Sequence, residues 1–308
     1  MRTFATEAGA PKAGAIRAGA IAAGLVLGLL APVLAGSAAP ASGNKADAEL
    51  ALFQPRNIFK SGLPRSHTIA LTFDDGPNAN TEAVLDALRE LNVKATFFIL
   101  GDQARRHPAL LKRIAAEGHL LANHSADHEQ LTSRYDAEPR LLLDELRETD
   151  ERIAPLMKPD DKLYFRAPYG SWRSTHAAIL NKDRRLRNYV GPVYWDIGGQ
   201  ISMSRDGYVM SSADWECWRI GWKAQTCAKG YLREIRRKDG GVVLMHCIHL
   251  NSARLVRAVV PALLEEGYNF VRLDQMPEYR QYETPQDGNA GMAQAGDLKH
   301  LASLRIVK

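Results

Sequence analysis

The stretch His67–Pro77 (HTIALTFDDGP) decides the fold class, because it joins a nearly unbroken apolar run directly to a polar turn. The run His67–Phe73 is rich in β-branched and aromatic residues, which predicts a strand that is buried on both faces. An amphipathic segment, Thr81–Leu91 (TEAVLDALREL), follows it, with Leu85 and Leu88 on one face and charged residues on the other. A buried strand followed by a helix is typical of a parallel sheet that is covered by helices.

The same alternation of strand and helix continues along the chain. The expected strands are His67–Phe73, Lys94–Leu100, His119–Asn123, Leu163–Arg166, Tyr189–Trp195, Gly241–His246 and Asn269–Leu273. The expected helices are Thr81–Leu91, Gln103–Ala116, Glu138–Ala154, Ala228–Lys238 and Ser252–Glu266. This rhythm predicts an α/β fold, a distorted and incomplete (β/α) barrel with about seven parallel strands. An open, doubly wound sheet is the alternative.

The composition is that of an ordinary folded protein. Of 308 residues, 45% are hydrophobic and 24% are charged, and 40 basic against 35 acidic residues give a net charge of +5. These values exclude a disordered chain, a collagen and a coiled coil. The even balance of charge argues against nucleic acid as a partner.

The N-terminus carries a pattern that predicts export. Three basic residues precede the 14-residue apolar run Ala18–Ala31, and small residues follow it up to Ala38. This is the pattern of a secretory signal peptide. A membrane-spanning helix needs ~20 apolar residues, so an uncleaved membrane anchor is the alternative. We expect an exported protein that is periplasmic or secreted, and in contact with the membrane only if this segment remains as an anchor.

The chain divides into four expected parts. We predict a signal peptide over 1–38, a linker over 39–65, a folded domain over 66–279 and a loose tail over 280–308. Inside the domain, the segment of about 198–227 departs from the strand–helix rhythm and contains three tryptophans and two cysteines. In an oxidising compartment those cysteines, Cys217 and Cys227, can form a disulfide across a loop and leave Cys247 unpaired. Three unpaired buried thiols are the alternative.

Polar groups follow five of the expected strands. The carboxyl ends of parallel strands meet at one edge of a sheet, where chemistry gathers in barrels and open sheets alike. Each signal is weak alone, since an Asp-Asp pair often only forms a turn. The histidine pair lacks the Glu of zinc peptidases, which disfavours that class. Taken together, the polar groups at the strand ends predict one functional site at this edge of the sheet. The groups concerned are Asp74 with Asp75, His124 with His128, Arg166, Asp196 and His246.

The residue types predict metal-assisted hydrolysis of an amide or ester. Asp75, His124 and His128 can bind Zn²⁺ through one carboxylate and two imidazoles, with a position left open for water. Zinc lowers the pKa of bound water to roughly 7. Asp74 is then free to accept the proton of the water, and His246 is suited to protonating a leaving amine.

Two further residues fit this chemistry. Arg166 can orient Asp74 through a charge-assisted hydrogen bond. The backbone N–H of Tyr169, which follows Pro168, can donate to a developing oxyanion.

Four motifs in this order resemble those of the polysaccharide deacetylases, the NodB-homology domain of carbohydrate esterase family four. Thr72–Pro77 matches the T-F-D-D-G-P motif of the family, and His124–His128 matches H-S-x-x-H. Arg166–Tyr169 matches R-x-P-Y, and Leu244–His246 matches L-x-H. The resemblance covers about 67–276 and implies a distorted β/α barrel.

The resemblance implies the same roles for these residues. It makes Asp74 the catalytic base, His246 the acid, Arg166 the partner of the base and Tyr169 the oxyanion donor, and it makes Asp75, His124 and His128 the metal ligands. It also adds Leu244, which would line a small pocket for the acetyl methyl group. The implied cofactor is a divalent metal ion, most often Zn²⁺, with Co²⁺ or Ni²⁺ as alternatives.

One motif departs from the family pattern. The family usually has a second aspartate followed by tryptophan soon after the fifth strand, but Asp196 is followed by Ile-Gly-Gly. An Asp-Trp pair occurs later, as Asp214 and Trp215. We therefore expect 198–227 to be an insertion. Either Asp214 or Asp196 would orient His246, and Trp215 would form a wall of the pocket.

The sequence thus predicts a metal-dependent hydrolase that removes acetyl groups from an N-acetylated, N-acetylglucosamine-containing polysaccharide. Peptidoglycan or an exopolysaccharide is the expected partner. The alternatives are a catalytically inactive glycan-binding protein on the same fold and an O-acetyl xylan esterase. Trp218 and Trp222 are either sugar-stacking platforms or ordinary core residues.

Overall fold

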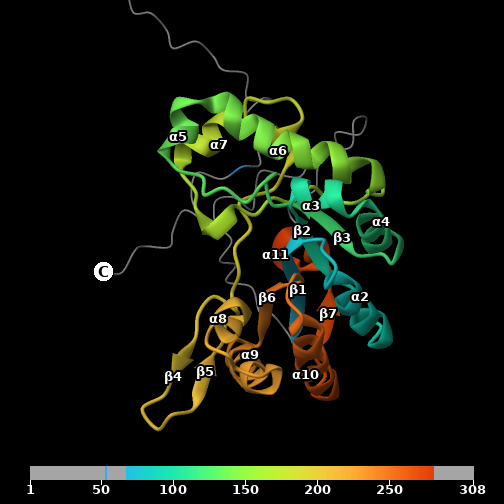
Figure 1. The fold of residues 1–308 in the computed structure, drawn as a ribbon, viewed down its shortest axis with the longest axis vertical. Helices are drawn as coiled ribbons and strands as arrows, with labels where there is room; N and C mark the ends of the chain where they lie inside the picture. Colours follow the sequence, from blue (N-terminus) through green and yellow to red (C-terminus); the bar gives the residue numbers. More distant parts are fainter. Residues whose placement is uncertain (1–52, 54–66, 281–308) are drawn as a thin grey trace, which may run out of the picture. The chain divides into compact units, whose positions relative to one another are not determined.

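The computed structural model describes Phe53 and residues 67–280, which form an α/β fold around a parallel sheet (Figure 1). The sheet has the strand order β3-β2-β1-β6, and β7 pairs with the first residues of β1. Its strands are β1 (Thr68–Gly76), β2 (Thr96–Ile99), β3 (Leu120–Asn123), β6 (Gly240–His246) and β7 (Asn269–Val271). The expected signal peptide, the tail from 281 and, apart from Phe53, the linker lie outside the described residues.

β1 is central because its side chains are apolar on both faces. Ile69, Leu71 and Phe73 are buried in one hydrophobic cluster, and Ala70 between them is buried in another. A strand covered on both faces has no solvent-facing positions, which explains why its sequence does not alternate between polar and apolar residues. The prediction of a buried parallel strand is confirmed here.

The helices surround this sheet largely where the amphipathic segments predict them. The longer helices are α2 (Thr81–Glu90), α4 (Pro108–Ala116), α6 (Pro139–Ile153), α9 (Ala224–Lys238) and α10 (Ser252–Glu265). The shorter helices are α3 (Gly101–Arg106), α5 (Ser133–Ala137), α7 (Ser174–Leu180), α8 (Asp214–Arg219) and α11 (Pro277–Arg280). The expected helix 103–116 is divided into α3 and α4, because Pro108 disfavours a helical conformation in the residue before it.

Two of the seven expected strands are reduced to isolated bridges, and the barrel is not closed. Leu163–Arg166 and Tyr189–Trp195 run along the sheet without forming continuous ladders. Pro168 and Pro192 lie in or just after them and have no N–H to donate to a ladder. The isolated parallel bridges among the described residues are Phe53–Gly191, Asn123–Phe165, Tyr164–Val190 and Ile197–Val243.

The segment 198–227 folds into its own substructure beside β6 (Figure 1). An antiparallel hairpin of β4 (Ser202–Met203) and β5 (Val209–Ser211) leads into the short helix α8. A disulfide between Cys217 and Cys227 links α8 to the first turn of α9, and Cys247 is a buried free thiol. The structure thus contains the disulfide and not the alternative of three thiols.

Phe53, in the middle of the expected linker, is packed against the domain. Its backbone N–H donates to Oδ1 of Asn181, and its carbonyl accepts from Nδ2 of the same side chain. Its ring stacks on Trp172 with the centroids 5.7 Å apart. Within the described part of the chain, no helix combines the length and the apolar character needed to cross a membrane.

Candidate metal centre and active site

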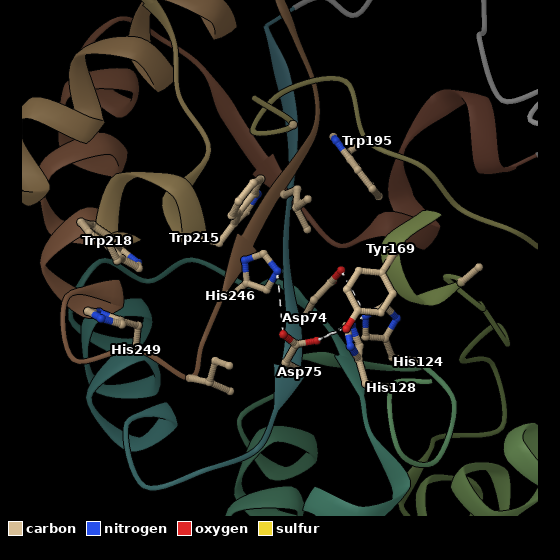
Figure 2. A pocket seen from close by; sticks show the side chains of 14 residues that line it. Asp74, Asp75, His124, His128, Tyr169, Trp195, Trp215, Trp218, His246 and His249 are labelled. Atoms are coloured by element: carbon tan, nitrogen blue, oxygen red, sulfur yellow. Dashed lines mark ion pairs between the residues drawn. The ribbon is translucent and has the colours of Figure 1, made fainter. Parts of the chain in front are cut away.

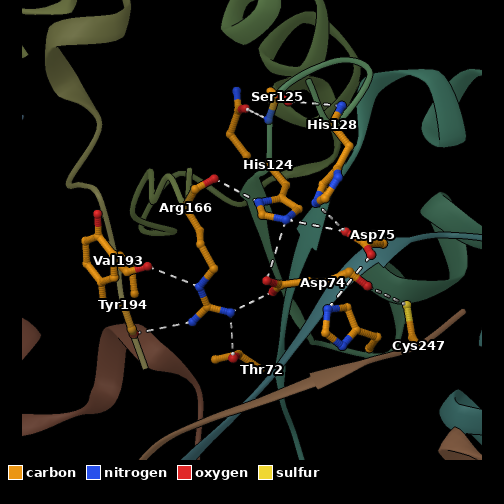
Figure 3. A network of polar contacts seen from close by, with 12 residues as sticks. Thr72, Asp74, Asp75, His124, Ser125, His128, Arg166, Val193, Tyr194 and Cys247 are labelled. Atoms are coloured by element: carbon orange, nitrogen blue, oxygen red, sulfur yellow. Dashed lines mark hydrogen bonds and ion pairs between the residues drawn. The ribbon is translucent and has the colours of Figure 1, made fainter. Parts of the chain in front are cut away.

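The end of β1 brings two adjacent carboxylates to the carboxyl edge of the sheet. Asp74 is paired in register with His246 on the neighbouring strand β6. Successive side chains of a strand point to opposite faces, and Asp75 has a left-handed backbone with φ of 69°. Asp74 therefore contacts Arg166, whereas Asp75 faces the two histidines that follow β3 (Figure 3).

A tight loop after β3 brings those two histidines together. His124 is held at the strand end because its backbone N–H donates to the carbonyl of Ile99 at 2.9 Å. Ser125 and His128 both have positive φ, 71° and 69°, which folds the loop back on itself. The hydroxyl of Ser125 accepts from the backbone N–H of His128 at 3.3 Å, and the two imidazole centroids lie 5.1 Å apart.

Asp75, His124 and His128 form a cluster that could hold a metal ion. Oδ1 of Asp75 lies 3.4 Å from Nε2 of His124 and 3.3 Å from Nε2 of His128. The potential ligand atoms all lie within 4.8 Å of one another. Among the described residues, no hydrogen-bond donor reaches this buried Oδ1. An unsatisfied buried carboxylate oxygen is costly, so the cluster fits a divalent cation that would compensate it.

The protonation states of the three side chains also suit metal binding. Nδ1 of His124 lies 2.8 Å from the carbonyl oxygen of Arg166, which can only accept, so Nδ1 carries the proton and Nε2 is free. Burial lowers the pKa of His128 below its ordinary value and keeps the ring neutral. Burial opposes the ionisation of Asp75, but the adjacent imidazole of His124 and the charge of His246 hold its pKa well below the usual range.

Arg166 fixes the orientation of Asp74 (Figure 3). Its Nη1 donates to Oδ1 of Asp74 at 2.6 Å and to the hydroxyl of Thr72 at 3.0 Å, and its Nε donates to the carbonyl of Val193 at 3.1 Å. The side chain of Arg166 is fully buried, so these charge-assisted bonds are not screened by water. The other oxygen of Asp74, Oδ2, lies 3.6 Å from Nε2 of His124.

His246 is held by Asp214. Its Nδ1 lies 2.8 Å from Oδ1 of Asp214, and its backbone N–H donates to Oδ2 at 2.7 Å. The hydroxyl of Tyr231 accepts from the backbone N–H of Asp214 at 3.0 Å. Asp196, the other carboxylate considered from the sequence, accepts instead from the backbone N–H of Val242 at 2.9 Å. Of the two candidates, Asp214 is the one that contacts the imidazole.

The surrounding carboxylates favour the protonated form of His246. Burial alone would lower its pKa, but the charge and hydrogen bond of Asp214, together with the charges of Asp75 and Asp74, raise the pKa of His246 to about 10. Its Nε2 lies 3.9 Å from Oδ2 of Asp75. His246 is therefore a candidate proton donor at neutral pH, beside the cluster of Asp75, His124 and His128.

One cavity of about 600 Å³ is lined by Asp74, Asp75, His124, His128 and His246 (Figure 2). Its volume lies within the range of small-molecule binding sites. Leu244 and Trp215 line it, as does Tyr169, whose side chain is 68% exposed and whose ring lies 4.5 Å from that of His128. The remaining lining residues include Ala167, Trp195, Gly199, Trp218, Ile248 and His249.

The sequence analysis assigns no role to several residues that support the site. Thr72 and Val193 hold Arg166, and Tyr231 both accepts from Asp214 and donates to the carbonyl of Leu244. Tyr231 lies on the buried face of an amphipathic helix, where a tyrosine is expected for packing alone. Its contact with Asp214 depends on how the 198–227 segment folds.

The fold and the cluster define an α/β protein with a candidate hydrolytic metal centre, and comparisons with known proteins agree. A family model described as polysaccharide deacetylase matches residues 62–184. A peptidoglycan-N-acetylglucosamine deacetylase of Bacillus cereus is 31% identical over 221 residues, which cover 70% of each chain. The chain belongs to the polysaccharide deacetylase family.

Two further matches define the extent of the similarity. The peptidoglycan-N-acetylglucosamine deacetylase PgdA of Listeria monocytogenes is 31% identical over 232 residues, 73% of this chain but 42% of that protein. The chain therefore spans less than half the length of this relative. A crystal structure of a peptidoglycan N-acetylglucosamine deacetylase with a bound N-hydroxybenzamide has a TM-score of 0.53 and 27% identity, covering 69% of this chain and 89% of that one.

Proposed function

We propose that the protein is an exported, metal-dependent hydrolase that removes acetyl groups from an N-acetylated polysaccharide such as peptidoglycan or an exopolysaccharide. One observation carries the proposal. Asp74 and His246, a candidate proton acceptor and a candidate proton donor, adjoin the cluster of Asp75, His124 and His128 in one cavity. Family membership and the substrates named for the relatives support the same reaction.

The three-residue cluster is the proposed metal site. A divalent cation held by Asp75, His124 and His128 would act as a Lewis acid and lower the pKa of water bound to it. Two imidazoles and a carboxylate are a donor set of catalytic zinc sites, so Zn²⁺ is the proposed ion, with Co²⁺ or Ni²⁺ as replacements. Three protein ligands leave coordination positions for water and substrate.

Asp74 and His246 are the proposed base and acid. Asp74 accepts a proton from the attacking water, whose oxygen joins the acetyl carbon, and His246 gives its proton to the amide nitrogen as the carbon–nitrogen bond breaks. The products are acetate and a free amine on the sugar. Arg166 and Asp214 act as positioning residues, because each holds one of these two groups in place.

The proposed acetyl pocket uses three more residues that line the cavity. Leu244 and Trp215 supply apolar walls for the methyl group. The backbone N–H of Tyr169 is the proposed donor to the oxyanion, and the turn that presents it has a positive φ of 56° at this residue. We propose a periplasmic or secreted location, which the signal-peptide pattern of the sequence supports.

Quantifying acetate release tests this proposal. The substrates are chitooligosaccharides, peptidoglycan, poly-N-acetylglucosamine and acetylated xylan, each with and without a chelator. We expect acetate from an N-acetylated polymer, loss of activity with the chelator and recovery on addition of Zn²⁺. Acetate from xylan alone would instead identify an O-acetyl esterase. Binding of glycan without release of acetate from any substrate would identify an inactive glycan-binding protein.

A further inference from the structure

A second cavity, of about 450 Å³, is formed by the β4–β5 hairpin and α9, which lie side by side (Figure 1). It shares no lining residue with the active-site cavity. Three cationic side chains line it, those of Lys229, Arg233 and Arg236, and no acidic residue of the described chain does. The cavity is therefore positively charged, and the proposed hydrolysis gives it no role.

Close packing of the hairpin on α9 gives this cavity a fixed shape. Gly230 lies directly against the end of β5, where a β-carbon would come within 2.1 Å of Oγ of Ser212. Nη1 of Arg233 donates to the carbonyl of Val209 at 2.9 Å, and the guanidinium carbon lies 5.5 Å from the centroid of the Tyr208 ring. These contacts hold the guanidinium in place at the wall of the cavity.

Two of the three cations have no acidic partner. Lys229 and Arg233 are four positions apart and so lie on one face of α9. Within the described residues neither forms an ion pair with a carboxylate, whereas Arg236 is bonded through two nitrogens to Glu266. The cavity therefore has two uncompensated positive charges, which attract an anionic ligand.

Aromatic side chains next to these cations favour a saccharide as the ligand. Tyr208 and Trp222 line the same cavity, and Tyr208 is 61% exposed. The flat face of an aromatic ring suits the C–H face of a sugar, and the two cations suit carboxylate groups. A hollow between a hairpin and a helix admits a single polymer chain. A flat membrane surface would instead contact the outermost side chains and not the half-buried Arg233.

We propose that the cavity bounded by Lys229, Arg233 and Tyr208 is a second binding site, which takes an acidic polysaccharide whose sugars carry carboxylate groups. The site goes beyond the proposed deacetylation and does not require it. Because the two cavities have no residue in common, the protein can hold a polymer at α9 while the active-site cavity binds an acetylated unit.

Calorimetric titration with a polygalacturonate decamer tests the site, because this polymer carries carboxylates and no acetyl groups. The wild type should bind it, and salt should weaken the binding by screening the charges. Lys229→Gln should bind it about fivefold more weakly, the upper end for an exposed ion pair. Tyr208→Ala should lose a similar factor through the lost ring face.

Lys112→Gln is the matched control, because Lys112 is an exposed lysine on α4 that does not line the cavity. It removes the same charge and should leave the binding of polygalacturonate unchanged. Midpoints of thermal unfolding for the wild type and all three variants report any loss of folding. An equal loss of binding in Lys112→Gln and Lys229→Gln would overturn the site, since only the net charge of the protein would then matter.

Further outcomes separate this site from its alternatives. Equal binding of polygalacturonate by the wild type and Lys229→Gln overturns it, as does equal binding of the methyl-esterified polymer by the wild type. Binding of phosphatidylglycerol vesicles through Lys229, without binding of polygalacturonate, overturns it in favour of a membrane surface. If the wild type releases no acetate from any substrate but binds polygalacturonate through Lys229, the second site stands and the proposed function fails.

Discussion

Asp214 holds His246 through both of its carboxylate oxygens, one on the imidazole at 2.8 Å and the other on the backbone N–H at 2.7 Å. The two residues are 32 positions apart, on α8 and β6. Asp214 is fully buried, so its charge acts on His246 with little screening. This pair sets both the orientation and the protonation of the proposed acid.

Replacing this carboxylate should shift the pH dependence of activity. A general acid works only while protonated, so activity falls as pH rises through its pKa. The charge of Asp214 raises the pKa of His246, and Asp214→Asn should therefore move the alkaline loss of activity to lower pH and reduce kcat at least ~10-fold. The check is the pH profile of acetate release for both proteins. An alkaline limb at the same pH in the variant would contradict the role of Asp214.

The proposed base gives a separate prediction. Asp74→Asn removes the proton acceptor but keeps the size of the side chain, so kcat should fall by ~10²–10⁴-fold. The variant should retain its metal, because Asp74 is not one of the three proposed ligands. Initial rates and the metal content of the same sample provide the measurement. Activity close to that of the wild type would exclude Asp74 as the base.

The disulfide should contribute measurably to stability. Cys217 and Cys227 are separated by 10 positions, and closing a loop of this size is worth about 2–3 kcal/mol in the chain-entropy model. The double variant Cys217→Ser, Cys227→Ser should lose this amount of unfolding free energy in urea titrations. A reductant should destabilise the wild type and leave the double variant unchanged. Equal effects of the reductant on both would argue against the cross-link.

His119, far from the proposed chemistry, should make the fold sensitive to acid. Its Nδ1 accepts from the backbone N–H of Ala95, and burial with nearby positive charges lowers the pKa of His119 from 6.5 to about 3. Between these values the unfolded chain binds the proton and the folded chain does not, so stability falls as pH drops below 6.5.

The size of this effect can be measured against a matched variant. At pH 4.5 the loss of unfolding free energy caused by the lowered pKa of His119 amounts to roughly 2–3 kcal/mol. His119→Asn keeps an acceptor for Ala95 but does not titrate, so it should lose less unfolding free energy between pH 7 and pH 4.5 in urea titrations. An identical loss in both proteins would show that another group controls acid stability.

Much of the fold and the proximity of the cluster could be predicted, because the signals are local. The apolar run of β1 leads directly into Asp74 and Asp75, and parallel strands end at a common edge of the sheet. The strand ends therefore bring Asp75 close to His124 and His128 whatever the details of packing. The buried face of α2 likewise follows from its helical period.

The remaining features depend on how distant segments pack. The sequence leaves both Asp214 and Asp196 open as the partner of His246, although only Asp214 is followed by tryptophan as in the family pattern. The choice depends on how 198–227 folds back against β6. The reduction of 189–195 to two isolated bridges depends on Pro192, which cannot donate to a ladder, and a pattern of apolar residues does not report this effect.

Titration of the metal-free protein with Zn²⁺ tests the central claim most directly. The wild type and Asp74→Asn should each bind one ion with similar affinity, and His124→Ala should bind it more than ~100-fold more weakly. That outcome would establish His124 as a ligand of the ion and leave Asp74 free to accept a proton. Unchanged zinc affinity in His124→Ala would contradict it.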